Sequence, residues 1–157
     1  MKNLVYLSFL LFSHPSFATE SKKKIIFDLA NFKWISYYNN ISVNSGIASG
    51  GKKYCPDIKR RCKTPIGIFK VISKKGKWYK SPLYPIGCSN IKGSKKLCAS
   101  MSYAIKFKHS GESIHGGVKG KLTAHTSHGC IHVNNEDAYW LNQVFVDIDT
   151  MIQILKY

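Results

Sequence analysis

The side chains best suited to covalent chemistry lie in a short stretch of the C-terminal half. Cys130 ends a Ser-His-Gly-Cys run, and His115 stands upstream of it, directly before Gly116. A cysteine becomes a strong nucleophile when a neighbouring base takes its proton, and histidine is the usual base. Gly129, just before the thiol, leaves room for a substrate and leaves backbone N–H groups for an oxyanion. The pattern therefore predicts a Cys–His nucleophilic enzyme.

The same residues allow a second interpretation, a zinc site. In an extended strand His128, Cys130 and His132 would point to one side, and His125 would complete four ligands. A Cys-x-His spacing this tight is unlike the usual structural zinc patterns, and Gly129 favours a turn. We therefore predict that the site binds no metal and uses no cofactor.

The other four cysteines are candidates for disulfide bonds. Cys55 and Cys62 lie seven residues apart, and Cys88 and Cys98 lie ten apart. Four cysteines allow three connectivities, and spacing alone does not choose among them. We prefer the pairing of neighbours, which leaves Cys130 as the single free thiol.

The N-terminus has the layout of a secretory signal peptide over residues 1–18. Lys2 precedes an apolar run over residues 4–12, and the small residues Ser16 and Ala18 predict cleavage after Ala18. That run is too short for a bilayer, which takes about 20 apolar residues. We therefore expect an exported protein of the periplasm or cell envelope, where disulfides persist.

Composition limits both the fold and the partners. The chain has 157 residues, which suits one domain over residues 19–157, and 44% of them are hydrophobic, which excludes a disordered tail. Its 24 Lys and Arg against 8 Asp and Glu give a net charge of +16. Such a charge attracts polyanions, but the lysines are scattered and form no nucleic-acid motif. No specific nucleic-acid partner is expected.

The elements that must position these residues are mostly strands. Alternating and β-branched runs predict strands over residues 24–29, 32–38, 41–47, 68–73, 101–107, 113–115 and 151–155. Asn39-Asn40 predicts a hairpin turn between the second and third of these. The stretch over residues 74–99 is expected to be a long loop or lid that carries Trp78, Tyr79 and Tyr84.

One helix is predicted near the C-terminus. Asn134 is a good N-cap, and Asp137 follows three residues later. Apolar residues at helical spacing predict a stripe that packs on the core: Ala138, Leu141, Val144 and Phe145.

Together these motifs resemble the L,D-transpeptidase family with a YkuD-type catalytic domain. The family signature is a His-Gly followed by Ser-His-Gly-Cys and a hydrophobic residue, which residues 115–116 and 127–131 match. Residues 64–69 match the family's Thr-Pro-x-Gly-x-Phe strand, and residues 135–138 fit the helix after the catalytic strand. The resemblance runs from about Lys24 to Leu155. The departures are His132 in place of the usual Arg and the four extra cysteines.

The resemblance implies a fold and a reaction. The fold would be mainly β, a β-sandwich of mixed sheets with one main α-helix. Cys130 would attack the tetrapeptide stem of peptidoglycan, form a thioester and release D-alanine. An amine acceptor, on another stem or on an envelope protein, would then resolve the thioester into a 3-3 cross-link or a related attachment. Carbapenems are expected to acylate the same thiol.

The resemblance also implies roles for individual residues. Cys130 would be the nucleophile and His115 the general base, with its second ring nitrogen oriented by backbone near Gly116. The residues expected to bind the oxyanion or support the loop are His128, Gly129, Ser127 and Gly116.

His132 is the residue that departs from the family pattern. On a continuing strand its side chain would share the face of Cys130. We expect it either to bind a stem carboxylate while protonated, below an ordinary histidine pKa of about 6.5, or to be a packing residue.

Two further functions remain open at this stage. A peptidoglycan hydrolase or amidase on the same scaffold would use water in place of the amine. A non-catalytic basic module that binds the cell wall is the other alternative, although binding alone needs neither Cys130 nor His115.

Overall fold

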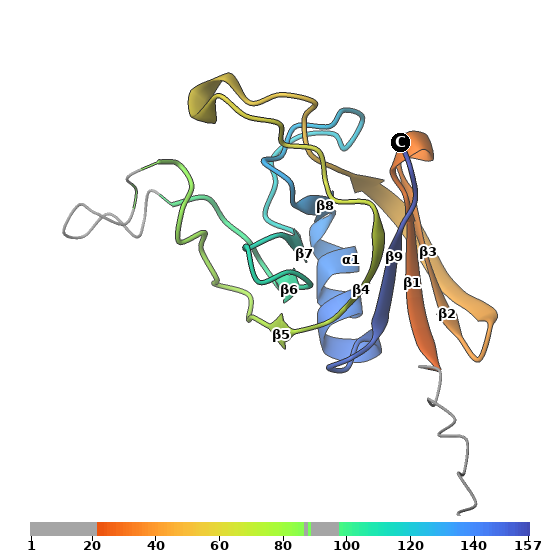
Figure 1. Ribbon diagram of the computed structural model, residues 1–157. Helices are drawn as coiled ribbons and strands as arrows, with labels where there is room; N and C mark the ends of the chain where they lie inside the picture. Colours follow the sequence, from red (N-terminus) through yellow and green to blue (C-terminus); the bar gives the residue numbers. More distant parts are fainter. Residues whose placement is uncertain (1–21, 87, 89–97) are drawn as a thin grey trace, which may run out of the picture.

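Nine strands form one continuous mixed sheet, and one helical segment packs against it (Figure 1). The computed structural model describes residues 22–86, 88 and 98–157, so the signal peptide predicted for residues 1–18 lies outside the described part. The strands are β1 (Lys23–Asp28), β2 (Lys33–Tyr38), β3 (Ile41–Ser49), β4 (Gly67–Lys70), β5 (Ser73–Lys74), β6 (Ile105–Lys106), β7 (Ser113–His115), β8 (Ile131–Val133) and β9 (Met151–Ile154). No helix within the described ranges is long and apolar enough to cross a membrane.

The strand order is β4-β9-β1-β2-β3-β8-β7-β6-β5. Neighbouring strands are antiparallel except for two parallel pairs, β1 with β9 and β7 with β8. The predicted hairpin between β2 and β3 is confirmed. Its turn residues Asn39 and Asn40 have φ values of 49° and 64°, the left-handed conformation that tight hairpin turns require.

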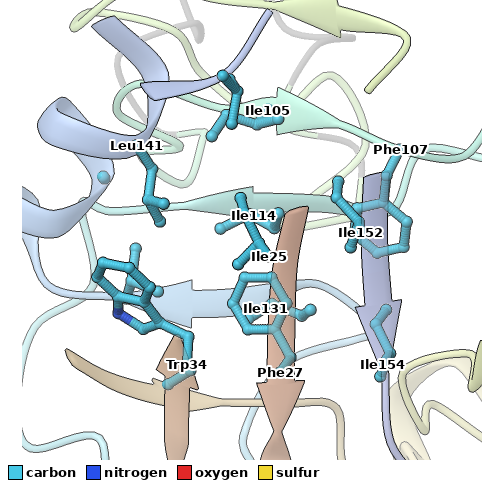
Figure 2. Packing of buried hydrophobic residues seen from close by; sticks show 14 of the residues in the cluster. Ile25, Phe27, Trp34, Ile105, Phe107, Ile114, Ile131, Leu141, Ile152 and Ile154 are labelled. Carbon is cyan, nitrogen blue, oxygen red and sulfur yellow. The ribbon is translucent and has the colours of Figure 1, made fainter. Parts of the chain in front are cut away.

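The sheet curls so that its two ends face each other across the core. We call β4, β9, β1 and β2 the scaffold half and β5 to β8 the site half; β3 joins them by pairing with both β2 and β8. Figure 2 shows Ile25 and Phe27 of β1 packed over Ile114 of β7 and Ile131 of β8, whose strands cross β1. Each such buried side chain contributes about 1.5–3 kcal/mol to folding. The expected mainly β architecture with one helical segment is therefore confirmed.

The helical segment begins as predicted. Asn134 caps it, because its side-chain oxygen accepts a hydrogen bond from the N–H of Asp137 at 2.9 Å. Helix α1 (Asn135–Tyr139) then continues into a π-helical turn, η4 (Trp140–Phe145), in which the N–H of Val146 donates to the carbonyl of Leu141.

The π-helical turn explains one wrong prediction. Ala138, Leu141 and Phe145 are buried, but Val144 is 59% exposed. A helix closed by i→i+5 bonds does not keep the 3.6-residue period on which the predicted stripe depends. Val146, which follows the turn, is buried instead.

Two predicted strands are shorter than expected. The strand predicted over residues 68–73 is divided between β4 and β5, because Val71 bonds to Thr150 beside β9 while Ile72 bonds to Lys106 of β6. The chain thus passes from the scaffold half to the site half at this point. The strand predicted over residues 101–107 keeps only β6, and the stretch before it includes Tyr103 with a φ of 55°.

Candidate active site

The parallel pair of β7 and β8 brings the predicted nucleophile and base together. Its register places His115 opposite His132 and Ile114 opposite Ile131, and Cys130 directly precedes β8. Because alternate residues of a strand share a face, Cys130 and His132 point to the same side. Cys130, His115 and His132 all line one cavity of about 520 Å³. This single strand pairing thus brings together a predicted base and a predicted nucleophile that are 15 residues apart in the sequence.

His115 is held in one tautomer. Its Nδ1 lies 2.7 Å from the carbonyl oxygen of Gly116, and since a carbonyl can only accept, Nδ1 carries the proton. The lone pair is therefore on Nε2, where it is free to take a proton. Burial lowers the pKa of His115, and the bond to Gly116 offsets only part of that effect. The ring is consequently a neutral base at neutral pH.

The backbone at Gly116 has no room for a side chain. A Cβ there would lie 2.6 Å from Oδ1 of Asn135 and 3.0 Å from Cβ of Ala138. Glycine thus lets α1 pack directly against the strand end that carries His115. Its predicted role in support of the base agrees with this geometry.

Cys130 is a free, partly exposed thiol among the described cysteines. Burial raises its pKa to about 11; a hydrogen bond with the Ser113 backbone lowers the pKa, and the Glu112 carboxylate raises it further. The resting pair is therefore a neutral thiol beside a neutral imidazole. A reaction at this thiol would therefore require its proton to pass to the imidazole as the sulfur attacks.

Ser127 holds the loop that presents the thiol. Its hydroxyl donates to the carbonyl of Cys130 at 2.6 Å and accepts from the N–H of Gly129 at 3.1 Å. Gly129 has a φ of +118°, which a side chain would strain. Because its N–H already bonds to Ser127, Gly129 supports the turn in this structure. Its contribution to an oxyanion hole stays a prediction.

Thr64, the first residue of the Thr-Pro motif, has a role that the sequence analysis did not assign. Its N–H donates to the hydroxyl of Tyr157 at 2.8 Å, and its own Oγ1 accepts from the N–H of Gly51 at 2.9 Å. The same Oγ1 lies 3.4 Å from the Cys130 carbonyl oxygen. Thr64 therefore ties the nucleophile loop to two other segments.

His128 is fixed by a residue that the sequence analysis also missed. Its Nε2 lies 2.7 Å from a carboxylate oxygen of Asp57, and its ring packs on Tyr84 with centroids 4.4 Å apart. Desolvation is the largest single influence on the pKa of Asp57 and raises it. The hydrogen bond and charge of His128, with smaller contributions from the backbone of Asp57 and from Lys52, together lower the pKa overall. In the sequence, Asp57 is marked only by its position between Cys55 and Cys62. With Nε2 engaged, His128 forms a wall of the site.

The disulfide bonds follow the preferred pairing of neighbours. Cys55 is bonded to Cys62, and Cys88 is bonded to Cys98. The first bond closes the loop that holds Asp57, which lies in the short 3-10 helix η2 (Pro56–Ile58). It thereby fixes the loop from which the partner of His128 extends.

His132 lies against the base, with the two ring centroids 4.9 Å apart. Burial, together with the charge that His115 would carry, lowers the pKa of His132 to about 3. Its Nδ1 is buried and has no hydrogen-bond partner among the described residues. The expectation that His132 titrates near pH 6.5 does not hold in this structure, because the ring is largely removed from water. Contact with a substrate stays a prediction.

The four ligands considered for zinc do not converge. Nδ1 of His125 accepts from the N–H of Gly50 at 2.9 Å, and its ring stacks on Phe32 with centroids 4.7 Å apart. His125 is therefore a packing residue. In the described part of the chain, a group of three close candidate ligands forms only at Cys55, Cys62 and His128, and the two sulfurs there are bonded to each other.

Two cavities meet at the thiol. Beside the larger one lies a second, of about 160 Å³, and both are lined by Ser81, Met101, His128 and Cys130. Charged residues line the smaller cavity: Arg60, Lys75, Lys106 and Glu112. Lys80 and Lys119 line the larger cavity, so basic residues lie on both sides of the thiol.

The aromatic residues of the predicted loop or lid have different surroundings. Tyr79 lines the smaller cavity and Tyr84 the larger one. Trp78 is 82% exposed and lines neither. Two of the three aromatic residues therefore lie at the site.

Solved structures with a similar fold are L,D-transpeptidases. One from Xylanimonas cellulosilytica has a TM-score of 0.68 at 23% identity, over 87% of this chain and 62% of that chain. One from Mycobacterium smegmatis has a TM-score of 0.65 at 21% identity, over 86% and 59%. The LD transpeptidase LdtMt1, solved in complex with imipenem, has a TM-score of 0.65 at 23% identity, over 85% and 59%. These likenesses show a shared fold, and the chain spans about 60% of the length of these structures.

The family comparison covers most of the chain. No curated protein matches the sequence significantly. The model of the YkuD family, described as the L,D-transpeptidase catalytic domain, matches residues 22–154, which include the whole sheet and every residue of the site described above except Tyr157. The chain therefore belongs to the YkuD family of L,D-transpeptidase catalytic domains.

Proposed function

We propose that this protein is an exported peptidoglycan L,D-transpeptidase that works through a Cys130 thioester. The observation that carries the proposal is the pairing of β7 and β8, which puts the free thiol and a tautomer-locked His115 in one cavity. Family membership and the L,D-transpeptidase fold support the same reaction class. Export rests on the sequence of residues 1–18 and is supported by the disulfide bonds.

The chemistry follows from the protonation states of the pair. Nε2 of His115 takes the thiol proton as the sulfur of Cys130 bonds to the carbonyl carbon of the third stem residue. The C–N bond to D-alanine then breaks, and the leaving amine takes the proton back from His115. An acceptor amine next attacks the thioester carbonyl carbon and gives its proton to the imidazole. The C–S bond then breaks, and the sulfur of Cys130 takes that proton back as the thiol.

The two cavities can be assigned to different parts of the substrates. The acceptor amine replaces the leaving amine, so both belong on the side of His115, in the larger cavity. The smaller cavity then receives the side chain of the third stem residue. A diamino acid carries an ammonium group and, in some walls, a carboxylate, which Glu112 and the nearby cations complement.

The decisive experiment incubates the mature protein with purified tetrapeptide muropeptides and reads the products by mass. We expect loss of D-alanine, an acyl-enzyme on Cys130 and 3-3 cross-linked dimers. A carbapenem should add once to the wild type and not at all to the Cys130→Ala variant. An adduct that persists in Cys130→Ala would contradict the assignment, and tripeptides without dimers would indicate the hydrolase alternative.

A further inference from the structure

A third cavity lies beside helix α1, outside the site described above. It is open, has a volume of about 530 Å³, and is lined by aromatic, amide and acidic side chains, among them Tyr103, Tyr139, Trp140, Asn135, Glu136 and Asp137. Neither Cys130 nor His115 lines it. The proposed reaction at the thiol therefore leaves this cavity without a role.

The aromatic rings of this cavity are held in place by packing. Tyr139 is half exposed and meets Tyr103 edge to face, with centroids 5.3 Å apart. Trp140 stacks between Trp34 and Phe145, at centroid distances of 6.1 Å and 5.2 Å. A fixed aromatic surface that is open to solvent suits a flat ligand with an apolar face.

The polar groups of the cavity are partly unused. The side-chain carboxylate of Glu136 accepts no hydrogen bond from any described residue, and the Nδ2 of Asn135 has no partner among them either. Asp137 already accepts from Trp34 at 3.1 Å, so Glu136 is the open acceptor and Asn135 the open donor. Glu136 and Asp137 outnumber Lys77, which is the only basic residue among the described residues of the lining, and this balance disfavours an anionic ligand here.

The cavity is joined to the active site through one hydrogen bond. Oδ1 of Asn135 accepts from the N–H of Gly117 at 2.6 Å, and Gly117 lines the larger cavity at the thiol. A ligand beside α1 and a stem peptide at Cys130 would therefore be neighbours. In the cell wall, the neighbour of a stem peptide is the sugar to which it is attached.

We propose that the cavity beside α1 binds a neutral N-acetylated sugar ring of the glycan strand that carries the stem peptide. The apolar C–H face of the sugar stacks on Tyr139, its hydroxyl groups donate to Glu136, and its acetamide carbonyl accepts from Asn135. This inference rests on the proposed function, because only a peptidoglycan substrate presents such a sugar next to the stem.

The first test measures binding of peptidoglycan oligosaccharides without stem peptides to the mature protein by NMR or calorimetry. Tyr139→Ala should weaken binding about three- to tenfold, the range of one aromatic contact. Glu136→Gln, which keeps the shape of the side chain, should also weaken oligosaccharide binding. If Tyr139→Ala does not fold, the Glu136→Gln variant alone tests the sugar site. Tyr38→Ala, on β2, is the control, because Tyr38 is also exposed and lies outside the cavity.

The second test compares free tetrapeptide with tetrapeptide still linked to glycan as the acyl donor. Both variants should raise KM for the glycan-linked donor and leave KM for the free peptide unchanged. An equal rise for both donors, or wild-type protein that binds no stem-free glycan, would overturn the sugar site. Carbapenem acylation of Cys130 involves no sugar. If the wild-type protein is not acylated, the proposed function is overturned, while glycan binding is still judged by the first test.

Discussion

The two halves of the curled sheet differ in how they are built. In the scaffold half, β1 and β2 have six residues each and alternate between the core and the surface. In the site half, β5 to β8 have two or three residues each, and the charged and reactive groups lie both on these strands and on the segments between them. Both halves bury side chains in the core, and the site half is held in addition by hydrogen bonds from residues such as Ser127 and Thr64.

The difference suggests that stability and chemistry can be changed separately. Phe27 of β1 is fully buried in the core and lines neither cavity at the thiol. We expect Phe27→Ala to lower the free energy of unfolding by about 3–5 kcal/mol through lost burial and the cavity left behind. Denaturant unfolding measures this, and the acylation rate per folded molecule should stay at the wild-type value. A catalytic defect in the folded fraction would break the comparison.

A change in the site half should have the opposite profile. His115→Ala removes the base beside Cys130, so acylation should slow by about 100-fold or more while the unfolding midpoint moves little. Stopped-flow acylation by a carbapenem measures the rate. His109→Ala is the matched control, because this exposed histidine lines neither cavity at the thiol. Equal rates in the two variants would remove His115 from the mechanism.

The Cys55–Cys62 loop affects both stability and the active site, because it is closed by a disulfide bond and also supplies Asp57, the partner of His128. Replacing both cysteines by alanine should destabilise the protein by roughly 2–3 kcal/mol through loop entropy, and should also slow acylation because His128 loses its fixed partner. The Cys88→Ala/Cys98→Ala double variant opens a loop of similar length and should lose similar stability. The histidine NMR signals report whether His128 still contacts Asp57. If that contact persists in the Cys55→Ala/Cys62→Ala variant, the disulfide bond does not hold Asp57 in place.

Glu112 allows a finer test of the electrostatics of the site half. Its carboxylate raises the pKa of Cys130, so Glu112→Gln should lower that pKa from its value of about 11. A shift of half a unit to one unit would raise the thiolate fraction at pH 8.5 roughly three- to tenfold. The iodoacetamide alkylation rate reports the change, and a slower reaction than in the wild type would contradict the sign. The same variant should bind amine-bearing stems more weakly.

The smallest expected effect concerns His132. With a pKa lowered to about 3, its ring should stay neutral between pH 5 and 8 and give no NMR titration there. Because the folded pKa lies below the ordinary value of about 6.5, stability should fall as the pH drops from 6.5 towards 3. His132→Asn should reduce that acid dependence. A midpoint near 6.5 for His132 would restore the sequence-based expectation of a charged ring.

The sequence predicted the scaffold half best. The runs over residues 24–29 and 32–38 alternate, and Asn39-Asn40 is a strong turn signal, so local rules are enough for the first hairpin. The division between β4 and β5 escaped prediction, because the change of partner at Val71 depends on β9, far away in the sequence. The prediction that Val144 packs on the core was wrong, because a π-helical turn leaves no clear signal in the apolar pattern.

The sequence named the reactive groups Cys130 and His115 and the supports Ser127 and Gly116, but it did not indicate the supports Asp57 and Thr64. Cys130, His115 and the contact at Gly116 follow from motifs and from the need for a neutral base. Asp57 was missed because its contact with His128 spans 71 residues and has no local pattern. The low pKa of His132 also could not be predicted, since burial depends on the packing of whole strands.

The place of β9 in the sheet has a consequence for folding kinetics. The β1–β2–β3 hairpins close from neighbouring residues, whereas β9 must insert between β4 and β1 from the far end of the described chain. Non-local pairing of this kind is slow, and until it happens β1 keeps an unpaired edge of the sort that promotes aggregation. β8 also pairs with a distant strand, β3, so the nucleophile that precedes β8 depends on a non-local pairing as well.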